Sequence, residues 1–207
     1  MEHSKAYKYL VMQINATGRE KADGYYPLIM EEIYDWERNE VEDIVWNTFH
    51  KNSDFGLAKF FPKLKKYDGI GALQDALPEC NMPSGNSVTV ARVLYDCTGD
   101  KEYLDVIKAN IDKDKNDIAS VAVLSYCKPG EDVYRLLADI YANTDDDTIR
   151  SAAFIGILYN KGFISDPHDL QEKEDKLELR RMFAKDNKEE RKDMINRLEA
   201  GEFDRFK

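Results

Sequence analysis

A dense run of carboxylates surrounds a tryptophan in the first third of the chain. The acidic residues between positions 31 and 43 are Glu31, Glu32, Asp35, Glu37, Glu40, Glu42 and Asp43, with Trp36 among them and Trp46 following. Such carboxylates can supply the acid and base of a glycosidase or ligate a metal ion. They can also form a solvated helix face whose tryptophans lie in the core.

A third use of the same residues is the docking of a basic protein. Carboxylates around exposed aromatic rings combine electrostatic attraction with a large contact area. On this interpretation, the candidate protein-binding residues are Glu32, Asp35, Trp36, Glu40, Asp43 and Trp46.

The other chemically reactive residue types are few and scattered. The histidines are His3, His50 and His168. They have no metal-binding spacing and no cysteine neighbours. We therefore expect no metal and no cofactor, and we interpret His50 as a helix C-terminal residue that contacts the last carbonyls. Cys97 and Cys127 are expected to be buried and structural, and Cys80 to be an accessible loop thiol. No nucleophile elbow, phosphate loop or dinucleotide fingerprint is present.

The charge balance narrows the class of partner. The 207 residues include 40 acidic and 30 basic side chains, which gives a formal charge of -10. This excess repels a phosphate backbone, so we do not expect nucleic acid as a partner. One local basic stretch is formed by Lys59, Lys63, Lys65 and Lys66. The cysteine spacing, the polar N-terminal sequence and the lack of a stretch of about 20 apolar residues predict a cytoplasmic protein without a membrane partner.

Apolar residues recur at three and four positions along most of the chain, which predicts helices. Within residues 1–77 the predicted helices cover 7–14, Pro27 to Trp36, 41–49, 57–64 with a kink at Pro62, and 69–77. Residues 78–86 are expected to form the longest irregular segment, a hinge or binding loop. Residues 167–207 are dense in both signs of charge and are expected to form a cap of two helices, broken near Asp186.

The middle of the chain carries an internal repeat. Ala91, Ala122 and Ala153 recur at 31-residue spacing. The same spacing separates the pairs Tyr95 and Tyr126, Gly99 and Gly130, and Tyr103 and Tyr134. We interpret each unit as a helix, a helix-ending glycine, a second helix and an aspartate-rich turn. Because an isolated helical hairpin cannot bury its apolar face, such hairpins stack, and one alanine per unit lets them approach closely.

The segment from Leu136 to Asp139, followed by Asp145 to Ala153, resembles the short bacterial HEAT repeat. That family combines a leucine-rich second helix, an acidic turn that caps the next helix, and a β-branched residue followed by arginine and two alanines. The resemblance implies that Arg150 bonds a neighbouring turn carboxylate and is structural. It covers 87–162 and, loosely, 1–77. The preceding unit has Ile118-Ala119 where an arginine would stand, so the arginine ladder is interrupted.

Together, the repeat and the resemblance predict one all-α domain over residues 1–207. Its expected architecture is an α-α superhelix, a HEAT-like helical-hairpin solenoid with a C-terminal helical cap. DNA-repair glycosylases share the HEAT-like architecture, but their function requires a cationic inner face that this acidic chain does not provide.

The predicted function is a non-enzymatic protein-binding module that uses the concave face of the helical array. Its size and acidity resemble those of bacterial toxin-neutralising immunity proteins, which implies a basic toxin as partner. The alternative is a HEAT-like lyase or hydrolase with a cleft near residues 78–86.

Overall fold

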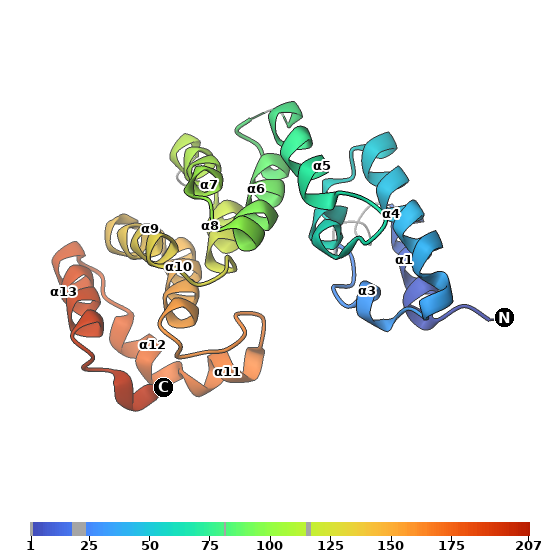
Figure 1. The fold of residues 1–207 in the computed structure, drawn as a ribbon. Helices are drawn as coiled ribbons and strands as arrows, with labels where there is room; N and C mark the ends of the chain where they lie inside the picture. Colours follow the sequence, from blue (N-terminus) through green and yellow to red (C-terminus); the bar gives the residue numbers. More distant parts are fainter. Residues whose placement is uncertain (1, 18–23, 81, 115–116) are drawn as a thin grey trace. The chain divides into compact units, whose positions relative to one another are not determined.

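The computed structural model describes residues 2–17, 24–80, 82–114 and 117–207. All regular elements in these ranges are α or 3₁₀ helices, with no strand among them, which confirms the predicted all-α class. The chain divides into two compact units, Met1–Thr98 and Gly99–Lys207, and each is described by itself (Figure 1). In the described ranges, no helix has the length and apolar character needed to cross a membrane.

The first unit is organised around a buried 3₁₀ segment. Its elements are α1 (Lys5–Asn15), α3 (Ile29–Glu32), η1 (Asp35–Glu37), α4 (Arg38–Asn52), η2 (Phe55–Lys63), α5 (Gly69–Ala76), η3 (Leu77–Glu79) and α6 (Gly85–Thr98). The helices predicted at 7–14, 41–49 and 69–77 are therefore present. The segment η2 packs against α4, α5 and α6, and it contributes Leu57, Phe60 and Phe61 to the core.

Two segments of this unit differ from the sequence prediction. The single helix expected from Pro27 to Trp36 is split into α3 and η1, because the backbone is extended at Tyr34 (φ -72°, ψ 150°). There the Glu37 carboxylate accepts the Tyr34 amide at 2.9 Å, which takes the place of a helical hydrogen bond. The segment expected over 57–64 is a 3₁₀ helix that contains Pro62. Proline lacks an amide donor and clashes with an α-helical carbonyl, so a regular α-helix is disfavoured there.

The irregular segment expected at 78–86 is shorter than predicted. Glu79 belongs to η3, and α6 already begins at Gly85. The start of α6 is fixed by a reciprocal pair of hydrogen bonds. The Ser84 amide donates to the Ser87 hydroxyl at 3.0 Å, and the Ser87 amide donates to the Ser84 hydroxyl at 3.2 Å.

The cysteine predictions were wrong at two positions. Cys80 is 3% exposed, its thiol donates to the Ala76 carbonyl at 3.4 Å, and burial raises its pKa. Cys97 is exposed, because it lies off the buried stripe of α6, whereas Cys127 is buried as expected. Cys97 is therefore a more accessible thiol than Cys80.

The second unit is built around α10. Its elements are α7 (Lys101–Lys113), α8 (Ile118–Ser125), α9 (Glu131–Asn143), α10 (Asp147–Asn160), α11 (Leu170–Asp175), α12 (Leu177–Phe183), α13 (Lys188–Glu199) and η4 (Asp204–Phe206). Helix α10 packs along α8 and α9, and α13 packs on α9 (Figure 1). The charged region thus contains three α-helices and the 3₁₀ helix η4 where two helices were expected. The predicted break near Asp186 lies between α12 and α13.

The aspartates of the turns act as helix caps, as predicted. Asp117 accepts the amides of Ala119 and Ser120 at the start of α8. Asp146 accepts the amides of Thr148 and Ile149 at 2.8 and 2.9 Å at the start of α10. These bonds satisfy amides that have no partner within the helix.

The burial pattern does not follow the 31-residue register throughout. In α7 the buried residues include Tyr103 and Ile107, and in α9 they include Val133 and Leu137. The spacing between equivalent buried positions of α7 and α9 is therefore about one residue shorter than the 31 residues of the sequence repeat. Gly130 does not end a helix. It is the extended N-cap residue of α9 (φ -170°).

The close approach between α8 and α10 occurs at Gly156. A side-chain carbon added there would lie 2.7 Å from the Ser125 Cα and 2.7 Å from the Leu137 Cδ1. The buried Ser125 hydroxyl is also within 2.8 Å of the Ala152 carbonyl on α10. Gly156 therefore provides a close approach in addition to the repeated alanines, of which Ala91 and Ala153 are fully buried.

We predict that Gly156→Ala destabilises the protein. Alanine favours a helix interior by about 1 kcal/mol over glycine. Here the new methyl group would overlap the backbone of α8, and such overpacking costs about 1–3 kcal/mol. Urea unfolding followed by circular dichroism should show a lower midpoint than the wild type. The exposed substitution Thr148→Ala on the same helix is the control, and a midpoint for Gly156→Ala at or above that of this control would contradict the assignment.

Candidate functional site

The predicted protein-binding residues all lie in the first unit, and the structure separates them into two groups. Glu32 and Glu40 lie beside α1, and Trp36 contacts His3 just before α1, whereas Asp43 and Trp46 contact the segment that follows η2. Asp35 is exposed next to Trp36 in the chain.

Trp36 is the centre of the first group. It is 42% exposed, and its ring lies 5.1 Å from that of His3 and 6.3 Å from that of Tyr34, which is 52% exposed. His3 stacks on Tyr7 at 3.9 Å, and the Tyr7 hydroxyl donates to Glu40 at 2.7 Å. That hydrogen bond raises the pKa of Tyr7 to about 12. A continuous chain of contacts thus connects Glu40 to Trp36.

Two further tyrosines extend this group beside Glu32. The Tyr26 hydroxyl donates to Glu32 at 2.8 Å, and the Tyr26 ring meets the exposed ring of Tyr9 edge-on at 6.0 Å. They line a hollow of about 300 Å³ with Lys5 and Ala6. We call this set the acid–aromatic surface: the exposed residues Tyr9, Glu32, Tyr34, Asp35, Trp36 and Glu40, together with the half-buried Tyr26.

The tyrosines of this surface were not predicted from the sequence. A signal existed for Tyr9, because it lies off the α1 stripe formed by the buried residues Ala6, Leu10 and Gln13. No such signal existed for Tyr34, whose exposure depends on the break between α3 and η1.

The second group makes its contacts within the chain. Asp43 accepts hydrogen bonds from Lys66 and Tyr67, which lower its pKa, and the Tyr67 ring stacks on Trp46 at 4.3 Å. Asp43 is therefore already neutralised by a lysine, and one face of Trp46 is already covered.

Three lysines of the basic stretch, Lys59, Lys63 and Lys66, are also engaged within the unit. Lys63 pairs with Glu31, and Lys66 pairs with Asp43. Burial lowers the pKa of Lys59, whose ammonium group donates to the Tyr25 carbonyl at 2.6 Å. These contacts leave Glu32, Asp35 and Glu40 as carboxylates without a lysine or arginine partner among the described residues.

Two carboxylates of the acidic run are buried and structural. Glu37 accepts the amides of Ser4 and Tyr34 at 2.8 and 2.9 Å and contacts His3 at 3.0 Å. Burial alone would raise the pKa of Glu37, but these hydrogen bonds outweigh it and the pKa is lowered.

Glu42 on α4 is the second buried carboxylate, and like Glu37 it accepts several hydrogen bonds. Its carboxylate accepts the Arg38 guanidinium at 2.7 Å and the amides of Lys65 and Lys66 at 2.9 and 2.7 Å. Burial again acts to raise the pKa, and the hydrogen bonds from Arg38 and the two amides lower it below 4.5. Glu42 therefore fixes the chain after η2 to α4.

We predict that Glu42→Gln removes part of the acid sensitivity of the first unit. A lowered folded-state pKa stabilises the fold above the unfolded value near 4.5, and this stability is lost as pH falls through the folded-state pKa. Glutamine would cost about 1–3 kcal/mol at neutral pH. Urea unfolding between pH 7 and 3 should show that the free energy of unfolding of the variant falls less steeply with decreasing pH than that of the wild type. The exposed control Asp75→Asn should keep the wild-type slope; an unchanged slope for Glu42→Gln would contradict this role.

A broad hollow of about 430 Å³ lies beside the segment that was expected to carry an enzymatic cleft. It is lined by Trp46, His50, Asp68, Gly71, Ala72, Asp75, Ala76 and Glu79, of which only Glu79 comes from residues 78–86. Its carboxylates are exposed at the surface. His50 Nδ1 lies 2.8 Å from the Trp46 carbonyl, which agrees with its interpretation as a helix C-terminal residue. In the described part of the chain, no three His, Cys, Asp or Glu side chains are placed to hold a metal ion.

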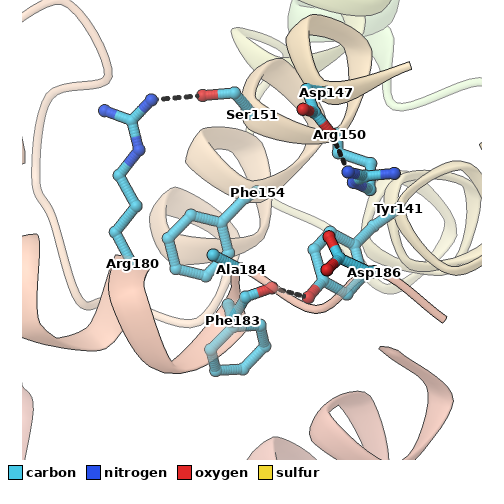
Figure 2. Close-up of a pocket in the computed structure, with 9 residues that line it drawn as sticks. All are labelled: Tyr141, Asp147, Arg150, Ser151, Phe154, Arg180, Phe183, Ala184 and Asp186. Atoms are coloured by element: carbon cyan, nitrogen blue, oxygen red, sulfur yellow. Dashed lines mark hydrogen bonds and ion pairs between the residues drawn. The ribbon is translucent and has the colours of Figure 1, made fainter. Parts of the chain in front are cut away.

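A smaller hollow lies in the second unit against α10. It has a volume of about 260 Å³ and contains both signs of charge around aromatic rings (Figure 2). Its lining residues are Tyr141, Asp147, Arg150, Ser151, Phe154, Arg180, Phe183, Ala184 and Asp186. Arg150 contacts the Asp147 carboxylate and the Thr144 carbonyl of the acidic turn, as the HEAT-like pattern implied.

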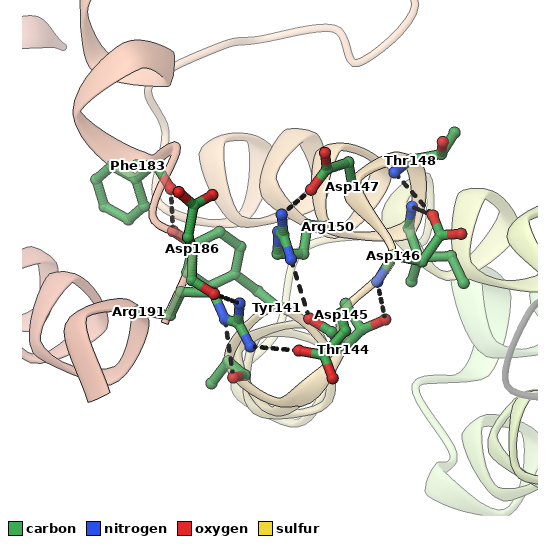
Figure 3. Close-up of polar contacts among 12 residues, drawn as sticks. Tyr141, Thr144, Asp145, Asp146, Asp147, Thr148, Arg150, Phe183, Asp186 and Arg191 are labelled. Carbon is green, nitrogen blue, oxygen red and sulfur yellow. Dashed lines mark hydrogen bonds and ion pairs between the residues drawn. The ribbon is translucent and has the colours of Figure 1, made fainter. Parts of the chain in front are cut away.

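Arg191, which was not predicted from the sequence, bonds the main chain of Asp186, one of the residues that line this hollow. It is 1% exposed, and its guanidinium donates to the carbonyls of Ala142 at 3.1 Å and Asp186 at 2.7 Å (Figure 3). It also contacts Asp145, which is 96% exposed, at 3.3 Å. A buried guanidinium requires such partners. Arg191 thereby ties α13 to the end of α9 and to the segment after α12.

We predict that Arg191→Ala destabilises the second unit by about 2–4 kcal/mol, since it creates a cavity and leaves two carbonyls without their donor. Urea unfolding would reveal this as a lower midpoint. Lys192→Ala, an exposed change at the next position, should alter stability by less than about 0.5 kcal/mol. Equal midpoints for the two variants would exclude the proposed role of Arg191.

Comparisons with protein-family models, with curated proteins and with solved structures found no match to this chain.

Proposed function

We propose that the protein is a non-enzymatic binding module that docks a basic protein on the acid–aromatic surface. The observation that carries this proposal is the exposure of Trp36 and Tyr34 beside carboxylates that have no lysine or arginine partner in the described ranges. Large exposed aromatic side chains are the residue type that most often dominates binding energy at protein interfaces.

The negative charge of residues 31–43 supports the proposal that the partner is a basic protein. Residues 31–43 hold seven carboxylates and one arginine, and Glu37 and Glu42 are consumed inside the fold. Glu31 and Asp43 pair with Lys63 and Lys66. The exposed Glu32, Asp35 and Glu40 attract lysine and arginine side chains, accelerate encounter and repel acidic proteins. Tyr7 and Tyr26 hold Glu40 and Glu32 by hydrogen bonds, so less side-chain entropy is lost when a partner binds.

For the architecture, we propose that residues 87–162 are HEAT-like hairpins. In the second unit, α10 packs along both α8 and α9, which is the pattern expected when one hairpin stacks on the next. The contacts of Arg150 with Asp147 and Thr144 also match the arginine of that repeat.

Within this class, we propose an immunity protein that neutralises a basic toxin. The supports are the size of the chain, its charge of -10 and the acid–aromatic surface. A tightly bound inhibitor needs fast association and a buried aromatic anchor, and this surface offers both.

We predict that the double variant Trp36→Ala/Glu32→Lys loses its partner. Affinity capture from source cells, quantified by mass spectrometry, should recover a basic protein with the wild-type bait and at least about tenfold less with the variant. Capture should also weaken as salt rises, because surface charges are screened.

The control bait carries Leu170→Ala, which removes an exposed apolar side chain from the second unit. It should recover the same protein as the wild type. Recovery of an acidic protein, or equal loss with both baits, would contradict docking at the acid–aromatic surface.

A further inference from the structure

The hollow in the second unit has opposite charges at its two ends. In Figure 2, Arg180 and Asp186 lie on opposite sides of Phe154 and Ala184. This separation of charge across an apolar middle is a property of the hollow that the acid–aromatic surface does not share.

The cationic end offers two donors. The Arg180 guanidinium donates to the Ser151 hydroxyl at 2.8 Å, and no carboxylate pairs with Arg180 among the described residues. Because Ser151 accepts this bond, its own proton remains available to donate. An exposed guanidinium beside a hydroxyl donor suits a ligand carboxylate.

The anionic end carries one net negative charge. Arg150 is matched by Asp147, and Arg191 is matched by Asp145 and reaches only the main-chain carbonyl of Asp186 (Figure 3). The Asp186 carboxylate is exposed and has no cationic partner among the described side chains. It is therefore available to a ligand ammonium group.

The floor between the two ends is apolar. The rings of Phe154 and Phe183 lie 4.8 Å apart, and the Tyr141 hydroxyl donates to the Phe183 carbonyl, which fixes the end of α12. The volume of about 260 Å³ has room for a small molecule.

We propose that this hollow binds a small zwitterion whose carboxylate and ammonium groups lie at opposite ends of an apolar middle. The carboxylate contacts Arg180 and Ser151, the ammonium group contacts Asp186, and the apolar middle lies over Phe154. This site is separate from the proposed protein-docking function.

The test is isothermal titration calorimetry of the full chain with ε-aminohexanoate, hexanoate and hexylamine. These share the apolar chain and differ only in the charged ends. The zwitterion should bind at least about tenfold more tightly than either single-ended compound, because each end adds a charged hydrogen bond. Equal affinities, or no binding of the zwitterion, would overturn the proposal.

Matched variants assign the two ends. Arg180→Gln should remove the advantage of ε-aminohexanoate over hexylamine, and Asp186→Asn should remove its advantage over hexanoate. Arg181→Gln, an exposed neighbour that does not line the hollow, should bind as the wild type does. Circular dichroism checks that each variant is folded, and indistinguishable binding by Arg180→Gln and Arg181→Gln would overturn the assignment.

A peptide that ends in lysine presents the same two groups. Binding of such a peptide, but not of its C-terminal amide, would support the same chemistry presented by a protein C-terminus. Binding of ε-aminohexanoate alone would support a free small molecule.

Discussion

Both units depend on the same constraint: a charge removed from water must be matched by hydrogen bonds. In the first unit, Glu37 holds the start of α1 to the turn before η1, and Glu42 holds the chain after η2 to α4. In the second unit, Arg191 joins α13 to the end of α9 and to the segment after α12. Apolar packing is not directional, whereas these bonds have fixed geometry. They therefore decide how segments distant in sequence are joined within each unit.

This constraint also shapes the surfaces. A carboxylate that accepts hydrogen bonds from backbone amides, such as Glu37, is buried. Neighbouring carboxylates remain at the surface around Trp36 and Tyr34. The backbone break at Tyr34, where Glu37 accepts the Tyr34 amide, lies at these exposed rings. The acid–aromatic surface thus adjoins a buried, hydrogen-bonded carboxylate.

The hollow in the second unit also depends on hydrogen bonds that fix the backbone. Arg191 fixes the chain at Asp186, and Tyr141 fixes the end of α12 at Phe183. With the backbone held at both points, the side chains of Arg180 and Asp186 are directed to the two ends of an apolar floor (Figure 2). A site on fixed elements loses less entropy on binding than one on a free loop.

The sequence alone determined the helical class, most helix positions and the aspartate caps, because these depend on periodicity and on contacts a few residues apart. It also located the acidic run. It could not separate Glu37 and Glu42 from their exposed neighbours, since their partners lie more than 20 positions away in several cases. For the same reason Arg191 was not predicted, nor was the close contact that Gly156 makes with Ser125. Only the tertiary structure decided which charges are buried, because burial depends on which distant segments meet.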